Sequence, residues 1–261
     1  MAEAGDIRYL VRGDGPGRGV DSGFLELGRR VRWLLLGGLG VATGLEVCWV
    51  TLQAWRGVPS HFASSGIDEA LFIAAGISIA LVGVILVAVT VLAFRSPIAP
   101  ASMALAIRVG LVLLLVGQGL GGAIIANGTA IDRPPTEVDL AILGTAGAMK
   151  VPHAVALHAV QVLPLLALVL GSTMLAERRR TQVVGAGALG YGLLVVGSMV
   201  QTFSGRGPLE PFVMGSLLAL TGVAILVAAF AVATRALILG GHRNVAPPAC
   251  QPRSGRAAAR T

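Results

Sequence analysis

The chain is a series of long apolar runs separated by short polar segments. Six runs hold about twenty or more mostly apolar residues, and a helix of that length crosses a hydrocarbon core about 30 Å thick at about 1.5 Å per residue. A barrel strand would instead alternate in polarity over about ten residues. The pattern predicts an all-α integral membrane bundle of six transmembrane helices at residues 31–55, 70–94, 105–127, 151–175, 183–203 and 212–236.

The composition also indicates that lipid, rather than water, surrounds most of the protein surface. The 261 residues are 55% hydrophobic and only 13% charged, whereas a soluble domain has about 25% charged residues. The mean hydropathy is +0.81. We therefore expect a six-helix transmembrane domain over residues 31–238, between a disordered polar tail at 1–30 and a disordered basic tail at 239–261.

The basic residues predict the orientation of the bundle. Arginines gather in the N-terminal tail, the 95–108 connection, the 178–180 turn and the C-terminal tail, while the other connections mix basic with acidic residues. Cytoplasmic loops carry the excess of arginine and lysine, so both termini are expected in the cytoplasm. The net charge of +7 then reflects topology, and a nucleic-acid partner is not expected.

Polar side chains inside the predicted helices point to a pocket. Glu46 and Gln53 are seven residues apart and share one helix face, and His158 and Gln161 are three apart and also neighbours on a face. With Gln118, they fall in the outer halves of the helices in the predicted orientation. The cytoplasmic halves hold few such groups. The sequence predicts an outward-facing polar pocket lined by Glu46, Gln53, Gln118, His158 and Gln161, with His61 from the first outer loop.

Glu46 is the most informative of these residues, because a carboxylate near the middle of a bilayer costs several kcal/mol unless it is paired, protonated or hydrated. It could act as a proton acceptor, a ligand or a partner for a cation. A protonated Glu46 that hydrogen-bonds a neighbouring helix would instead be structural. The sequence leaves both interpretations open.

Three histidines are candidate ligands for a metal or a haem iron: His61, His153 and His158. His153 and His158 are five residues apart, so they point about 140° away from each other on a helix and cannot chelate one ion together. A metal would have to be shared between helices or loops, for example by His158 and His61. Hydrogen bonding between helices and anchoring at the membrane interface are the alternative roles.

Small residues recur four positions apart at Gly40 and Gly44, Gly117 and Gly121, and Ala186 and Gly190. In lipid, such pairs let helix backbones approach closely. They predict packing seams, most simply between helices of the same chain.

Two segments carry a resemblance. The stretch Gly-Val-Pro-Ser-His-Phe at 57–62 and the stretch Val-Pro-His-Ala-Val-Ala-Leu-His-Ala-Val-Gln-Val-Leu-Pro at 151–164 resemble a family of uncharacterised bacterial multi-pass membrane proteins. A looser similarity links the chain to four-helix membrane haem proteins such as haem A synthase, which implies haem ligation by histidines at outer helix ends. The fifth and sixth predicted helices carry no histidine, and this departure weighs against haem.

Three functions fit the sequence. The pocket could bind a cofactor, a metal or a small polar ligand; Glu46 could serve as the gate of a proton-coupled transporter of small solutes; or the polar groups could only hold helices together. A transporter typically shows repeat symmetry and polar groups in both leaflets, and an enzyme needs a nucleophile or a metal triad. Neither pattern is visible, so a binding role is preferred. The abundance of Gly, Ala and Arg suggests a high-GC bacterium and its cytoplasmic (inner) membrane.

Overall fold

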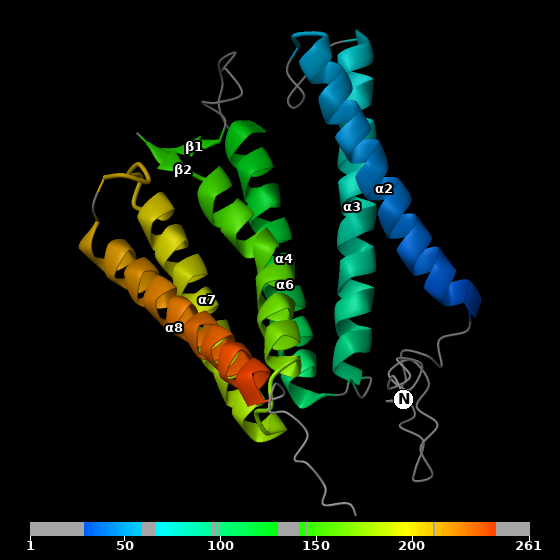
Figure 1. Ribbon diagram of the computed structural model, residues 1–261. Coiled ribbons are helices and arrows are strands. Elements are labelled where there is room, and N and C mark those ends of the chain that lie inside the picture. Colours follow the sequence, from blue (N-terminus) through cyan, green and yellow to red (C-terminus); the bar gives the residue numbers. More distant parts are fainter. Residues whose placement is uncertain are drawn as a thin grey trace, which may run out of the picture.

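The computed structural model confirms the all-α fold with six long apolar helices (Figure 1). It describes residues 29–58, 66–95, 98, 100–129, 141–144, 146–210 and 212–243. Each helix is long and apolar enough to cross a membrane, so the protein is a multi-pass membrane protein. The helices are α2 (Arg29–Trp55), α3 (Gly66–Arg95), α4 (Ala101–Thr129), α6 (Lys150–Gly171), α7 (Glu177–Phe203) and α8 (Val213–Arg243).

Some helices are longer than the predicted apolar runs, because polar residues form their first turns. The helix α7 begins at Glu177, six residues before the predicted start, and the Glu177 carboxylate accepts a hydrogen bond from the backbone N–H of Ser102 at 2.7 Å. The helix α3 begins with Asp68 and Glu69 in its first turn, where acidic groups are favoured by the helix dipole. Hydropathy alone cannot detect such polar turns.

Two helices end at residues other than the predicted ones. The helix α6 ends at Gly171, four residues early, because Thr173 turns the chain: its hydroxyl donates to the Leu170 carbonyl at 2.7 Å. The helix α8 continues to Arg243, so helix extends into the first residues of the segment predicted as a basic tail. The rest of both predicted tails lies outside the described residues.

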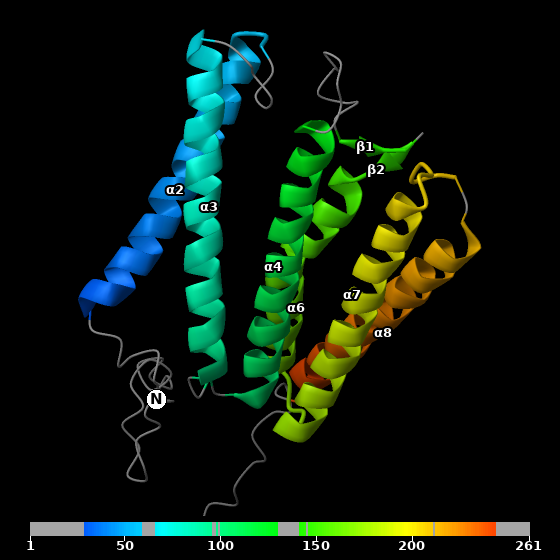
Figure 2. The ribbon, with the colours of Figure 1, turned by 180° about the vertical axis from the view of Figure 1, so that it is seen from behind.

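The bundle has two parts that meet at α4. The helices α2 and α3 lie on one side of α4, and α7 and α8 lie on the other, in both views (Figures 1 and 2). The helix α6 packs along α4 and also contacts α7 and α8. The helix α2 makes its main contacts with α3, and α3 in turn packs on α4. The pair α2–α3 is therefore joined to the other four helices chiefly through α4.

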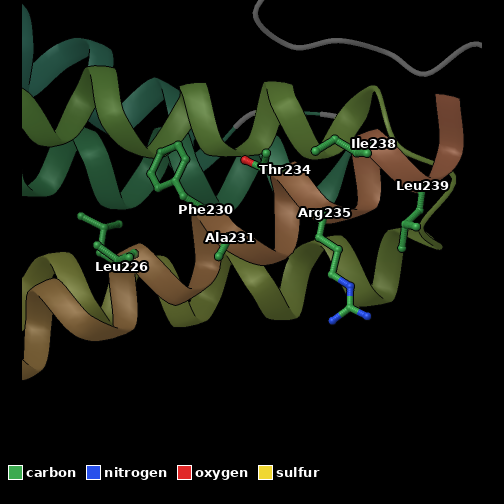
Figure 3. A pocket seen from close by; sticks show the side chains of 8 residues that line it. Leu226, Phe230, Ala231, Thr234, Arg235, Ile238 and Leu239 are labelled. Atoms are coloured by element: carbon green, nitrogen blue, oxygen red, sulfur yellow. The ribbon is translucent and has the colours of Figure 1, made fainter. Parts of the chain in front are cut away.

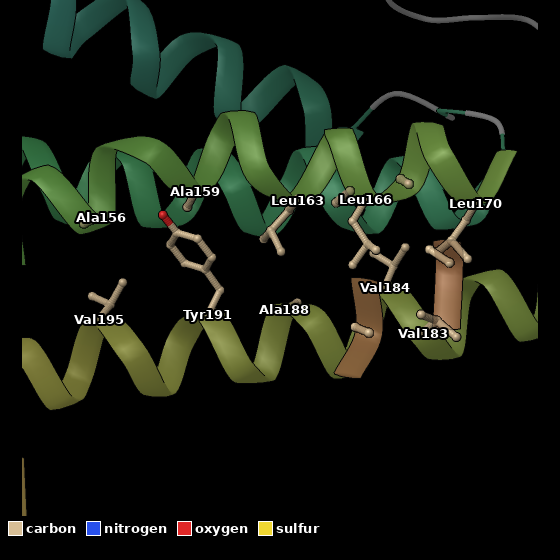
Figure 4. Close-up of a cluster of buried hydrophobic side chains, with 14 of the residues drawn as sticks. Ala156, Ala159, Leu163, Leu166, Leu170, Val183, Val184, Ala188, Tyr191 and Val195 are labelled. Atoms are coloured by element: carbon tan, nitrogen blue, oxygen red, sulfur yellow. The ribbon is translucent and has the colours of Figure 1, made fainter. Parts of the chain in front are cut away.

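The main core lies between α6 and α7 (Figure 4). Leu163, Leu166 and Leu170 of α6 are fully buried against residues such as Val184 of α7. Tyr191 crosses the same interface, and its hydroxyl donates to the Val155 carbonyl at 2.8 Å. This bond satisfies the buried phenol.

A small antiparallel hairpin closes one end of the bundle. It consists of β1 (Ile142–Leu143) and β2 (Gly147–Ala148), with Ile142 opposite Ala148. Asn127 at the end of α4 donates to the Ile142 carbonyl at 3.1 Å, and the Thr202 hydroxyl of α7 donates to the Ala148 carbonyl at 3.3 Å. We call this the hairpin end of the bundle, and the opposite end, where α2 begins and α8 ends, the terminal end.

Of the three predicted packing seams, two lie at contacts between helices and one does not. A Cβ atom on Gly117 would lie 2.8 Å from Leu157 Cδ2, and one on Gly190 would lie 2.8 Å from the Gly222 carbonyl oxygen. These two glycines therefore form seams between helices of the same chain, as predicted. Gly40 and Gly44 have no atom within 4 Å of such a Cβ, so their face of α2 packs on no neighbour among the described residues.

Candidate functional site

Glu46 lies on the face of α2 that is turned toward the rest of the bundle. Ala42 and Gln53 on this face are each only 2% exposed, and Glu46 and Trp49 between them are half-buried. The flanking residues of α2 are exposed, for example Val47 at 59%. The helical period therefore places the Glu46 carboxylate on the inward face of α2, as its seven-residue spacing from Gln53 indicated.

Glu46 and Gln118 both follow one apolar cluster along their helices. The cluster holds Ala42 of α2 with Val82 and Leu86 of α3, and Leu114 and Leu115 of α4 pack against it. Glu46 is four residues beyond Ala42, and Gln118 is four beyond Leu114, and both helices run from the terminal end to the hairpin end. Residues four apart share a helix face, so each polar side chain lies about one turn beyond the cluster, toward the hairpin end.

His153 of α6 completes the group. The Glu46 carboxylate interacts electrostatically with this histidine, which is half-buried. Within the part of the chain that the structure describes, neither Glu46 nor Gln118 has a side-chain hydrogen-bond partner. Their hydrogen-bonding capacity is therefore open to a ligand.

The backbone of α4 fixes the orientation of His153. Its Nδ1 lies 2.7 Å from the Gly117 carbonyl oxygen. A carbonyl only accepts hydrogen bonds, so Nδ1 carries a proton and donates it, and Nε2 is the ring nitrogen left for another partner. A Cβ atom on Gly121 would lie 3.0 Å from the His153 Cε1, so Gly121 leaves room for the ring. The sequence marked Gly117 and Gly121 as a packing seam, but gave no sign that they seat a histidine.

Gln53 takes part in a polar corner between α2 and α3. Its amide donates to Asp68 Oδ1 at 3.2 Å, and its carbonyl oxygen accepts from Arg56 at 2.7 Å. Arg56 also forms an ion pair with Asp68. These bonds use the polar groups of Gln53 inside the corner, so its role in this structure is to join the two helices rather than to line the group around Glu46.

His158 and Gln161 lie on a different face of α6 from His153. Both are exposed, together with Val151, Ala154 and Leu165 at the same three- and four-residue spacing. The Nδ1 of His158 donates to the Ala154 carbonyl of its own helix at 2.7 Å. The structure therefore does not join these two side chains to Glu46 by any hydrogen bond.

The candidate metal ligands are not assembled in the described part of the chain. His61 lies outside the described residues, and His153 and His158 diverge as their spacing predicts. No three His, Cys, Asp or Glu side chains among the described residues lie close enough together to hold a metal ion.

The site is thus Glu46, Gln118 and His153, contributed by α2, α4 and α6. It offers a carboxylate, an amide and an imidazole nitrogen, and the carboxylate suits a ligand that donates hydrogen bonds and carries positive charge. No family model matches the chain, and no curated protein or solved structure matches it either.

Proposed function

We propose that the protein binds a small polar solute carrying a positive charge at the site formed by Glu46, Gln118 and His153. The observation that carries the proposal is the inward-facing Glu46 carboxylate, which has no hydrogen-bond partner among the described residues. An ionised carboxylate within a membrane span is stable only when it is paired or hydrated. A cationic ligand supplies the hydrogen-bond donor that the described residues do not.

His153 supports this choice of ligand chemistry. Its Nδ1 is committed to the Gly117 carbonyl, so Nε2 is the ring nitrogen left for a ligand. A ligand ammonium group can donate to the Glu46 carboxylate, while the Gln118 amide contacts a polar part of the same molecule.

We further propose that the hairpin end faces away from the cytoplasm of a bacterial cell, so that the site opens outward. Support comes from the basic residues: Arg95, Arg178 to Arg180, Arg29 at the start of α2 and Arg243 at the end of α8 lie at the terminal end. The described basic residues at the hairpin end are Arg56, Lys150 and Arg206, and Arg56 is paired with Asp68. This asymmetry fits the excess of basic residues on the cytoplasmic side of inner-membrane proteins.

Thermal unfolding of the detergent-purified protein tests the binding role. The probes are ethylenediamine, choline, zinc ion, haemin and, as an anion of similar size, acetate. A probe at about 100 times its Kd stabilises a folded protein by about 2.7 kcal/mol, which corresponds to about 5 °C or more in Tm. We expect such a rise with an organic cation, and none with acetate.

The matched variants are Glu46→Gln and Glu69→Gln. Glu69 is an exposed carboxylate in the first turn of α3, so its loss leaves the site intact. Glu46→Gln should remove the rise in Tm and Glu69→Gln should keep it. Stabilisation by haemin or zinc alone, or an equal response of both variants, would contradict the proposal.

A further inference from the structure

A groove with a volume of about 700 Å³ runs along α8, far in sequence from the site of Glu46 (Figure 3). Its walls are almost entirely apolar, from Leu226 through Phe230 and Ala231 to Leu239, and its polar side chains are Thr234 and Arg235. Because α8 is one of the six membrane helices, the exposed residues of this groove meet lipid rather than water.

The dimensions of the groove fit one lipid chain. From Leu226 to Arg235, where the positive charge lies, the helix rises about 14 Å at about 1.5 Å per residue. One leaflet of the hydrocarbon core is about 15 Å thick, half of the full core. The groove therefore follows α8 through about one leaflet, which is the depth that a single acyl chain occupies.

Arg235 places a positive charge in the half of the groove nearer the terminal end of the bundle, about one turn before the last lining residues, Ile238 and Leu239. Its side chain is exposed, and within the described residues it makes no hydrogen bond or ion pair. Arg235 is eight residues before the end of α8, about 12 Å along the axis. A long arginine side chain at this depth extends toward the headgroup region.

Charge and shape together indicate which class of lipid the α8 groove binds. A guanidinium binds a phosphate through two parallel hydrogen bonds. A zwitterionic lipid has its own cation beside the phosphate, so it gains less from Arg235 than an anionic lipid does. We propose that the α8 groove holds one anionic phospholipid, with an acyl chain against Phe230 and Ala231 and the phosphate on Arg235.

Native mass spectrometry of the detergent-solubilised full chain tests this site. The protein is titrated with phosphatidylglycerol and with phosphatidylcholine of identical acyl chains, and the bound fraction is read for wild type, Arg235→Gln and Arg178→Gln. One arginine near an anionic headgroup corresponds to about fivefold in affinity. Wild type and Arg178→Gln should prefer phosphatidylglycerol by about fivefold, and Arg235→Gln should bind both lipids equally. Arg178 is an exposed arginine at the same end of the bundle that does not line the groove.

A second variant tests the acyl part of the site. Ala231→Phe fills the groove from an exposed position, so it should weaken the binding of both lipids without unfolding the protein. Glycerol phosphate, which has the headgroup charge without the chains, should not compete. Unchanged lipid preference in Arg235→Gln, unchanged binding in Ala231→Phe, or competition by glycerol phosphate would overturn the proposal.

Discussion

Replacing Gly190 with valine is expected to leave little folded protein. A Cβ atom at this position would lie 2.8 Å from the Gly222 carbonyl oxygen and 2.9 Å from the Leu226 backbone nitrogen. Both atoms belong to the backbone of α8, which cannot move aside as a flexible side chain can. Overpacking a well-packed core typically costs about 1–3 kcal/mol and occasionally more, and a clash with backbone belongs at the upper end. The yield of monodisperse protein after detergent extraction, with Tm, measures the effect.

Gly192→Val is the matched control, because it makes the same substitution two residues along the same helix. A Cβ atom on Gly192 has no neighbour within 4 Å. Both variants change the intrinsic preference for helix equally, so any difference between them reports the contact of α7 with α8. Equal yields and equal Tm values for the two variants would show that the two helices are not packed as closely as described.

The second large effect is expected at Glu46. Glu46→Leu should raise Tm by about 2 °C or more in the absence of ligand, and it should abolish the response to organic cations. The reason is that the carboxylate lies inward without a hydrogen-bond partner among the described residues, and a charged side chain at the centre of a membrane helix costs about 2.5–3.5 kcal/mol, a cost that leucine removes.

Glu69→Leu is the corresponding control in the first turn of α3, where the carboxylate is exposed. It should lower Tm slightly, since an acidic group near a helix N-terminus contributes about 0.3–1 kcal/mol. If Glu46→Leu instead reduces the yield of folded protein, Glu46 holds the helices together and is not kept for a ligand.

The sequence predicted the parts of the structure that depend on local patterns. Apolar length alone located all six helices, and the 3.6-residue period placed Glu46 and Gln53 on one face of α2. It also showed that His153 and His158 diverge. Each of these conclusions depends only on the geometry of a single helix.

The sequence could not predict contacts that depend on which helices are neighbours. His153 is seated by Gly117 and Gly121 because α4 packs along α6, and Gln53 is bound by Asp68 because α2 and α3 form a tight corner. From the sequence alone, His158 was an equally reasonable member of the site, because residue spacing does not show which face of α6 is exposed. The groove on α8 depends on surface shape, for which the apolar pattern carries no signal.

Accessibility of position 46 to a water-soluble thiol reagent tests the central claim most directly. Glu46→Cys and, as a control, Val47→Cys are made after both native cysteines, Cys48 and Cys250, are changed to alanine. Val47 is 59% exposed on the outer surface of α2, where lipid excludes water. The measurement is the rate of modification by a membrane-impermeant cationic methanethiosulfonate added to the side that the hairpin end is proposed to face.

A hydrated site that opens at the hairpin end predicts rapid modification of the cysteine at position 46 and slow modification of the cysteine at position 47. The cysteine at position 46 should be modified rapidly both in detergent and in lipid. Labelling of position 46 only from the cytoplasmic side, or no labelling at either position, would contradict an outward-facing site for a polar ligand.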